Sequence, residues 1–538
     1  MRSAPPLHPC SMPADHRTGP VVLLGFDAAD PDLVERWARE GKLPTMAKLM
    51  ARGAWARTGG EELLFEHGIW TTLFSGVSTA RHGFHFFWQP VPRSYGLELK
   101  RGRDLGVVPF WAWLRGTGRS VLVLDPPDTA PVRGLERTQV SEWATHSHYP
   151  PLPLEGEPSS AIADVRKAFG PREQIGERIG ASEVSDRVMV ERLIARASRK
   201  GRAVRALIAK RSYDLVVAVF SEAHTGGHQA WEYRRDAKGD GPRADAGLGD
   251  AVLRLYHAVD DEIGRIVDAL PPTATVFVTS SVGMLSQYPT EELLENFCRR
   301  LGYQATPQRA APSGPKARRS ITTRLRGLVP ARARNVVSRF LPFQVQARLL
   351  SQKFAASTDW SRTTVYAPPG YYTGCLRVNL RGREPNGIVS PGAEYDALLT
   401  RLEGDLHALR DAETGEPVIE RTVRTRDAFG DDDVHPALPD LIVFWREHDK
   451  PLRRVHHPRA ELTQSRHPFH RGSHHTTEGL LVAAGAGVRA AGRVPDISPL
   501  SLAPTLLTLL DIAPPDEMTG PPLHDWLVQS PALSDSGT

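Results

Sequence analysis

The chain has 538 residues, of which 40% are hydrophobic and 24% charged, with a formal net charge of +5. This is the composition of a globular protein with enough apolar material for a large core, which excludes a disordered or fibrous chain. The sequence contains no run of about 18 uninterrupted apolar residues, so we expect no membrane-spanning helix.

The two ends of the chain differ in composition from the rest. Residues 1–19 are rich in proline and lack the apolar segment of a signal peptide, so we expect a disordered tail there and a second tail at 531–538. Cys10, Cys298 and Cys375 are far apart and show no CxxC spacing, which predicts no disulfide framework. A reducing compartment suits such a chain, and we expect a cytoplasmic location.

Short apolar strands alternate with amphipathic helices along the chain. We predict strands at residues 21–26, 120–124, 214–220, 275–278 and 480–484, and helices at 31–52, 188–210, 251–270 and 502–510. This alternation predicts an α/β fold, in which a largely parallel sheet is covered by helices on both faces.

Two segments interrupt this rhythm. Residues 301–350 contain many arginine, alanine and proline residues, and we expect a basic insertion there. A second insertion, around residues 85–185, is expected to form a cap on one composite domain that spans residues 20–530. A basic stretch can bind phosphate-rich partners, but it is more often a solvated surface. The absence of interleaved aromatic residues and of any nucleic-acid-binding motif argues against a nucleic-acid partner.

Polar residues that follow parallel strands line the ligand crevice of such sheets, which makes two early segments candidates. Asp27 follows the first strand and is either a cation ligand or the N-cap of the next helix. Thr71 and Thr72 are predicted near the start of a helix. A hydroxyl there can hold an anion or attack as a nucleophile activated by a metal, although a plain N-cap is the alternative.

Histidines provide the third and fourth candidates. His224 and His228 follow a predicted strand four residues apart, a spacing that allows both to face one metal from a single helical turn. A polar surface turn is the alternative. Either His474 or His475, just before the strand at 480–484, is a candidate for the third ligand.

Together these segments resemble the alkaline phosphatase superfamily, and within it the type I phosphodiesterase/nucleotide pyrophosphatase family. Asp27 is similar to the family's first metal ligand. The run Thr72-Leu73-Phe74-Ser75-Gly76, followed by His82-Gly83, resembles the family's nucleophile turn and places Thr72 rather than Thr71 at the nucleophile. The resemblance implies a three-layer α/β/α fold with cap insertions.

Later segments extend the resemblance to about residues 20–530, apart from the basic insertion. His224 and His228 fall where the family has an Asp-x-x-x-His ligand pair, and His475 matches a late family histidine. Further similar stretches are residues 379–389, 438–443 and 497–510.

The sequence departs from the family pattern at two places. Histidine at position 224 replaces an aspartate, and it is still a competent metal ligand. After the strand at 275–278, where the family has Asp-His-Gly, this chain has Ser281 and Val282. Valine cannot coordinate a cation, so the metal beside the nucleophile would keep only Asp27 and Thr72 as ligands.

The resemblance implies a metal-dependent hydrolase of small-molecule phosphate esters, similar to phosphodiesterases, with Thr72 as the nucleophile. It implies one or two zinc ions, with manganese as the alternative, held by Asp27, Thr72, His224, His228 and His475. Two other functions stay open. One is a metal-binding regulatory protein that has lost catalysis, and the other is a sulfatase-type hydrolase of sulfate esters.

Overall fold

The structure is a computed structural model. It describes residues 19–60, 64–65, 67–100, 104–146, 152–176, 183–234, 247–287, 290–307, 343–370, 373–430, 434–448, 450–465 and 473–528. The predicted tails, apart from Gly19, and residues 308–342 of the predicted basic insertion lie outside these ranges.

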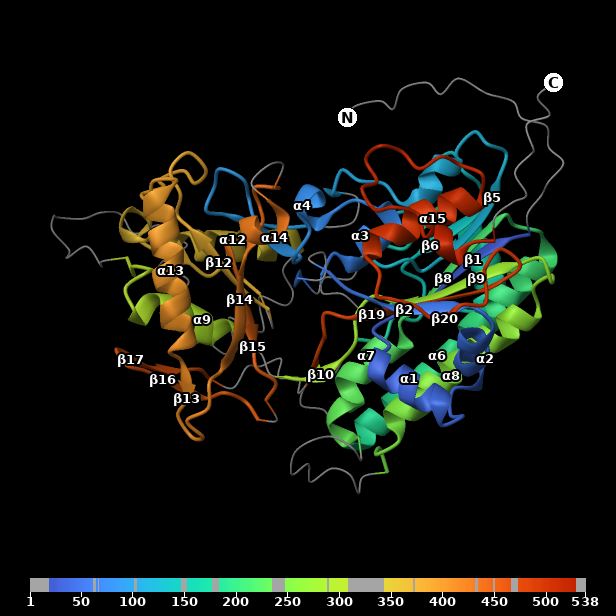
Figure 1. Cartoon of the computed structure of the whole chain (residues 1–538), viewed down its shortest axis with the longest axis horizontal. Coiled ribbons are helices and arrows are strands. Elements are labelled where there is room, and N and C mark those ends of the chain that lie inside the picture. The colour runs from blue at the N-terminus through green and yellow to red at the C-terminus, as the bar shows by residue number, and fades with distance from the viewer. Residues whose placement is uncertain are drawn as a thin grey trace.

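A nine-stranded sheet forms the centre of the larger unit (Figure 1). β1 lies in its middle and pairs in parallel with β8 and β9, while β19 is antiparallel to both of its neighbours. The strands in spatial order are β20 (Gly492–Arg493), β2 (Ala54–Thr58), β19 (Gly479–Gly485), β9 (Thr275–Ser280), β1 (Val21–Phe26), β8 (Leu215–Phe220), β5 (Ser120–Leu124), β6 (Glu136–Ser141) and β7 (Glu155–Glu157). The central strands β1, β5, β8 and β9 are buried along their whole length, as expected for strands covered on both faces.

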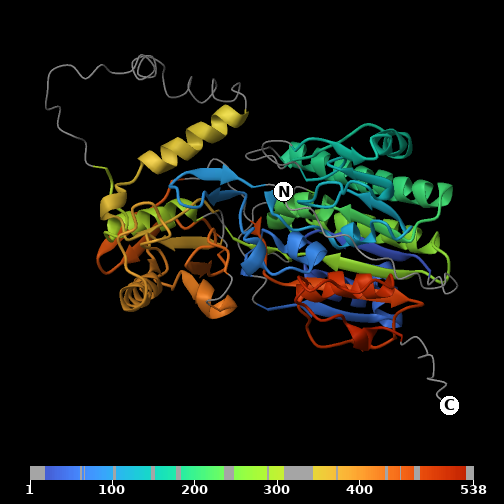
Figure 2. The same ribbon diagram turned by 90° about the horizontal axis from the view of Figure 1, so that it is seen from above.

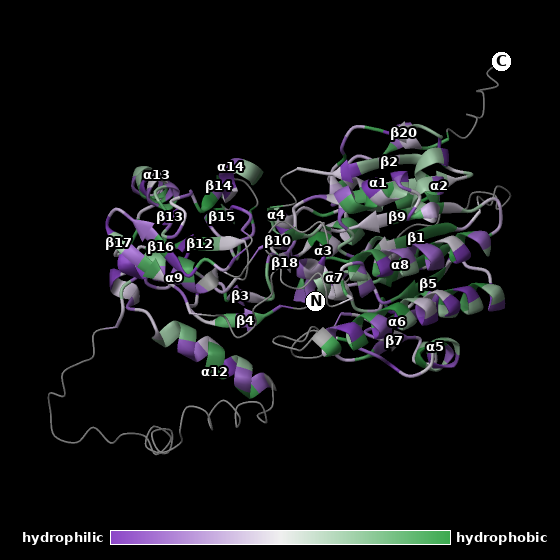
Figure 3. Ribbon diagram, turned by 90° about the horizontal axis from the view of Figure 1, so that it is seen from below, coloured by the Kyte–Doolittle hydropathy of each residue, from purple (hydrophilic) through white to green (hydrophobic). Residues whose placement is uncertain are grey.

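Helices cover both faces of this sheet (Figure 1). One layer consists of α1 (Pro31–Arg39), α2 (Pro44–Arg52), α5 (Ala161–Phe169), α6 (Glu183–Lys210), α7 (Glu222–Ala230) and α8 (Ala251–Asp268). The other contains α3 (Ile69–Ser75) and α15 (Leu502–Leu509), while α4 (Thr79–His82) lies between this unit and the smaller one (Figure 1). Figure 3 shows the hydrophobic colour concentrated on the central strands between these layers, where the main core lies.

A second, smaller unit has its own hydrophobic core (Figure 2). Its sheets have the strand orders β11-β12-β15-β14 and β13-β16-β17. The strands are β11 (Val365–Tyr366), β12 (Gly374–Val378), β13 (Arg410–Asp411), β14 (Ile419–Arg424), β15 (Leu441–Trp445), β16 (Arg454–His457) and β17 (Ala460–Thr463). Its helices are α9 (Glu291–Arg300), α12 (Phe343–Ala356), α13 (Ala393–His407) and α14 (Thr425–Phe429). Two further two-stranded antiparallel sheets pair β3 (Trp88–Pro90) with β4 (Leu97–Leu99) and β10 (Leu285–Ser286) with β18 (Ser473–His474).

The α/β fold with a largely parallel sheet is confirmed, and the structure adds three details to it. The helix expected at 31–52 is two helices, because Gly41 adopts a positive φ of 73° and Pro44 begins a new helix. Within the insertion expected around residues 85–185, β5, β6 and β7 belong to the large sheet, whereas β3 and β4 form a separate sheet. The residues of the second core lie between positions 291 and 463, inside the one composite domain that the sequence predicts.

Among the helices that the structure describes, none has the length and apolarity needed to cross a bilayer.

Candidate metal centre

The candidate residues converge at the carboxyl edge of the large sheet. Asp27 directly follows β1, and Ser281 directly follows β9. α7, which begins just after β8, carries His224 and His228. Because β8 and β9 are the two parallel neighbours of β1, their carboxyl ends meet at one place. This edge faces the smaller unit (Figure 1).

Three histidines form a compact group at this edge. One potential ligand atom from each of His224, His228 and His475 lies within 4.8 Å of the other two. Nε2 of His228 is 3.1 Å from Nε2 of His475. Two nitrogens bound to a tetrahedral zinc ion are about 3.3 Å apart, so this spacing fits such an ion.

The other nitrogen of each ring is held by the protein. Nδ1 of His224 donates to the Asp27 carboxylate at 2.8 Å, and Nδ1 of His475 donates to the carbonyl of Gly283 at 3.1 Å. Nδ1 of His228 lies 3.2 Å from the Ser473 hydroxyl. A proton on Nδ1 leaves the Nε2 lone pair available, and partners of this kind fix the rings of metal-binding histidines.

Burial and neighbouring groups together set the charges of His228 and Asp27. Burial lowers the pKa of His228 well below its ordinary value, and the neighbouring His475 and His224 add to this effect. The imidazole is therefore neutral, as a metal ligand must be. Burial alone would raise the pKa of Asp27, but His224 and Trp70 outweigh it, so the net pKa is lowered and the carboxyl stays ionised.

Asp27 is fully engaged by protein groups. Its Oδ2 accepts from His224, while Oδ1 accepts from the Trp70 indole N–H at 2.8 Å and from the Ser281 hydroxyl at 3.2 Å. Val282 is buried in the main core. The carboxylate that was expected to bind a cation therefore orients His224 and is surrounded by hydrogen-bond donors.

The hydroxyl of Thr72 contacts other residues than this group. Trp70 and Thr72 are two residues apart on α3 and so point to opposite sides of the helix, and Trp70 faces Asp27. The side chain of Thr72 has no exposed surface, and its hydroxyl lies 2.9 Å from Nε2 of His82 and 3.3 Å from Oγ1 of Thr79. Nδ1 of His82 accepts from a backbone N–H, so Nε2 carries the proton and donates to Thr72. His82 thus cannot take a proton from Thr72 in this arrangement.

The sequence profile of the type I phosphodiesterase/nucleotide pyrophosphatase family matches residues 21–339. The chain belongs to this family. The match covers more than half of the chain, including Asp27, His224 and His228, and confirms the resemblance found in the sequence. Members of the family hydrolyse phosphate esters. A search of curated proteins found no match.

Solved structures with a similar fold are distant in sequence. An inactive variant of murine ectonucleotide pyrophosphatase/phosphodiesterase 5 in complex with AMP is 11% identical, with a TM-score of 0.47, and the match covers 95% of this chain and 100% of that one. The human counterpart is also 11% identical, over 95% and 100% of the two chains, with a TM-score of 0.45. Phosphonoacetate hydrolase from Sinorhizobium meliloti 1021 in complex with phosphonoacetate is 11% identical, over 92% and 95%, with a TM-score of 0.48.

Several residues that support the site were missed in the sequence. Ser473, the first residue of β18, contacts Nδ1 of His228, and His475 follows directly after the end of this strand at His474. The convergence of the ligand atoms identifies His475 rather than His474 as the member of the group. Gly283 takes part only through its backbone carbonyl, and Trp70 lies on an apolar helix. Nothing in the sequence therefore indicated that either residue supports the site.

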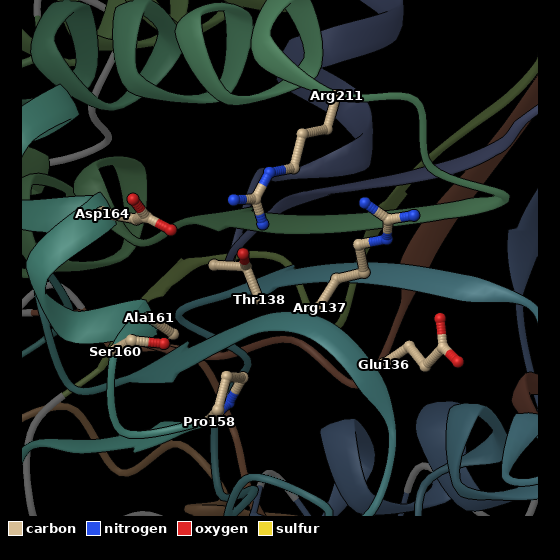
Figure 4. Close-up of a pocket in the computed structure, with 8 residues that line it drawn as sticks. All are labelled: Glu136, Arg137, Thr138, Pro158, Ser160, Ala161, Asp164 and Arg211. Carbon is tan, nitrogen blue, oxygen red and sulfur yellow. The ribbon is translucent and has the colours of Figure 1, made fainter.

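A pocket of about 280 Å³ lies away from these residues (Figure 4). It is found near the start of β6 and the N-terminus of α5, at the opposite end of the strands from the histidines. Its lining residues are Glu136, Arg137, Thr138, Pro158, Ser160, Ala161, Asp164 and Arg211. None of the candidate residues lines it, so the functional assignment rests on the histidine group.

Proposed function

We propose that this chain is a metal-dependent hydrolase of phosphate esters that binds one zinc ion through Nε2 of His224, His228 and His475. One observation carries the proposal: the three rings converge while a carboxylate, a hydroxyl and a carbonyl oxygen hold their Nδ1 atoms. Three nitrogen ligands favour zinc over manganese, which prefers oxygen. Three protein ligands also leave a fourth position for a substrate, as in catalytic zinc sites.

The protein's own residues prepare this site. A bound zinc ion would act as a Lewis acid on a phosphoryl oxygen and stabilise the charge that develops there. Asp27, assigned as a ligand from the sequence, is proposed instead to fix the ring of His224 and its Nδ1 proton. His224 is partly exposed, with 22% of its side chain accessible, so a small-molecule ester can approach from its side.

The surroundings of Thr72 and Thr71 differ. Thr72 is buried and hydrogen-bonded to His82 rather than to the three histidines of the proposed site, which counts against attack by its hydroxyl. The hydroxyl of Thr71 has no hydrogen-bond partner among the residues that the structure describes. Both threonines therefore enter the experiments as separate variants.

A second candidate is a metal-binding regulatory protein without catalysis. The donors that surround Asp27 favour it, since Trp70 and Ser281 occupy the oxygen that a second cation would need. In this case the histidines would still bind zinc, but no ester would be hydrolysed.

The test combines metal analysis with an ester screen. The purified chain and a His228→Ala variant are analysed for bound zinc and assayed with aryl phosphodiesters, phosphomonoesters and sulfate esters, with added zinc or manganese. We expect one zinc ion per chain, phosphodiester hydrolysis, and loss of both in the variant. Zinc binding without hydrolysis of any ester would support the regulatory alternative, and preference for sulfate esters would support the sulfatase alternative.

We further propose a cytoplasmic location. Cys298 and Cys375 are both buried with free thiols, which agrees with a reducing compartment. Fractionation of cells that express the tagged chain tests this point.

A further inference from the structure

Helix α6 carries two cations that are completely buried. Arg196 and Lys200 are four residues apart on the same face, and neither side chain has exposed surface. Arg196 pairs with Glu222 at 2.7 Å, and Lys200 pairs with Asp125 at 3.1 Å. Buried ion pairs of this kind cost desolvation free energy and often contribute no net stability, so they call for another explanation.

Both cations connect the same two segments of the chain. Lys200 donates to the carbonyl of Ala144 at 2.9 Å and to the carbonyl of Val219 at 2.7 Å. Arg196 donates to the carbonyl of Thr145 at 2.9 Å and to the hydroxyl of Ser221 at 3.1 Å. Residues 144–145 follow β6, whereas residues 219–222 form the junction of β8 and α7. α6 thus links the loop after β6 to the start of α7, the helix that carries His224 and His228.

The loop after β6 leads to His146, which lies against His224, one of the proposed metal ligands. The rings of His146 and His224 are stacked, with centroids 4.6 Å apart and planes inclined by only 14°. Nδ1 of His146 is also 3.2 Å from the hydroxyl of Thr225, a buried residue of α7. Asp27 therefore fixes the edge of the His224 ring, and His146 covers its face.

We propose that Arg196 and Lys200 are positioning residues that hold His146 flat against His224 and so keep this ring in the orientation that binds the cation. The inference rests on the proposed zinc site. It gives the two buried cations of α6 a role other than stabilising the fold, to which buried ion pairs often contribute little. It also identifies His146, which is outside the three-histidine group, as part of the support of that group.

The first experiment separates positioning from stability. In the double variant Arg196→Met/Glu222→Leu, apolar side chains replace a buried pair, a change that is often neutral for stability. We expect a urea midpoint close to that of the wild type, but zinc affinity weaker by about 10–100-fold, as for other partners of metal-binding histidines. Zinc affinity is measured by competition with a chromophoric chelator, and the visible spectrum of the cobalt(II) form reports the ligand geometry. Arg192→Met, which removes a cation of the same helix that pairs at the surface with Glu173, is the control.

The second experiment concerns the stacked ring and covers the case in which the double variant fails to fold. His146→Phe keeps an aromatic ring on His224, whereas His146→Ala removes it. We expect His146→Ala to weaken zinc binding by about 10–100-fold and His146→Phe to retain most of the affinity. Equal losses in both variants would show that a nitrogen of His146 binds the metal directly and would overturn the positioning role.

The outcomes distinguish this inference from the proposed function. If the wild type binds zinc and hydrolyses esters while Arg196→Met/Glu222→Leu and His146→Ala keep wild-type zinc affinity, the inference is wrong and the proposed function stands. If the wild type binds no zinc, the proposed function fails, and the inference fails with it.

Discussion

The imidazole of His224 donates its Nδ1 proton to the carboxylate of Asp27 at 2.8 Å, and only 5% of the Asp27 side chain is exposed. A carboxylate behind a histidine fixes its tautomer and raises its basicity as a ligand. In the proposed zinc site Asp27 would therefore act on the metal through His224, although its place after the first strand suggested direct coordination.

We predict that Asp27→Asn weakens zinc binding by about 10–100-fold while the stoichiometry stays at one ion per chain. The amide oxygen is a weaker acceptor for the Nδ1 proton of His224, so the ring is held less firmly. Titration with a chelator of known affinity measures the change. Ser281→Ala is the control, because Ser281 contacts Oδ1 of Asp27 rather than the oxygen that binds His224. Equal losses in both variants would contradict the role given to Asp27.

Adjacent histidines provide a second, internally controlled prediction. We expect His475→Ala to abolish tight zinc binding, because Nε2 of His475 lies 3.1 Å from Nε2 of His228 at the centre of the group. We expect His474→Ala to keep the zinc ion, since His474 is not among the three residues whose ligand atoms converge. Metal content after dialysis distinguishes the two, and loss of zinc in His474→Ala alone would reverse the assignment.

The sequence predicted those parts of the fold and site that depend on local pattern. β1, β5, β8 and β9 are apolar runs that end in polar residues, so both the sheet and its carboxyl edge could be inferred. The spacing of His224 and His228 likewise showed that they share one helical face.

Other parts depend on contacts between segments far apart in the chain. β6 has exposed residues at its start, and β7 is only partly buried, so neither gave the apolar signal that would have moved residues 85–185 into the sheet. Thr72 was chosen over Thr71 because of its position in the family's motif. The direction of the Thr72 side chain, however, follows from the contact of Trp70 with Asp27, two residues that are 43 positions apart in the sequence.

A third prediction concerns the role of Thr72. We expect Thr72→Val to keep kcat within about tenfold of the wild type, a change of less than about 1.4 kcal/mol in the barrier. It should lower stability by about 1–3 kcal/mol, because the buried Nε2–H of His82 loses its acceptor. Stopped-flow assays and urea unfolding measure the two effects. A loss of several orders of magnitude in kcat would restore Thr72 as the nucleophile, and Thr71→Val is assayed in parallel as the neighbouring hydroxyl.

The last prediction follows from the buried carboxyl of Glu142, in the loop between β6 and His146. Burial raises the pKa of Glu142 from 4.5 to about 7, although the Thr145 hydroxyl partly opposes this shift. Between these values the unfolded chain releases the proton and the folded chain retains it. Glu142 therefore lowers the free energy of unfolding progressively as the pH rises from 4.5 to 7, by up to about 3 kcal/mol.

Replacement of this carboxyl by an amide should remove the pH dependence. Glu142→Gln cannot ionise, and its side chain can still contact Thr145 and Gln174, the partners of the native carboxyl. We expect the stability difference between Glu142→Gln and the wild type to grow in favour of the variant as the pH rises through this window and to level off above it. Urea unfolding at pH 4 to 8 measures the difference, with Glu136→Gln on the exposed start of β6 as the control. Parallel curves for Glu142→Gln and the wild type would show that Glu142 titrates alike in the folded and unfolded chains, contrary to the raised pKa.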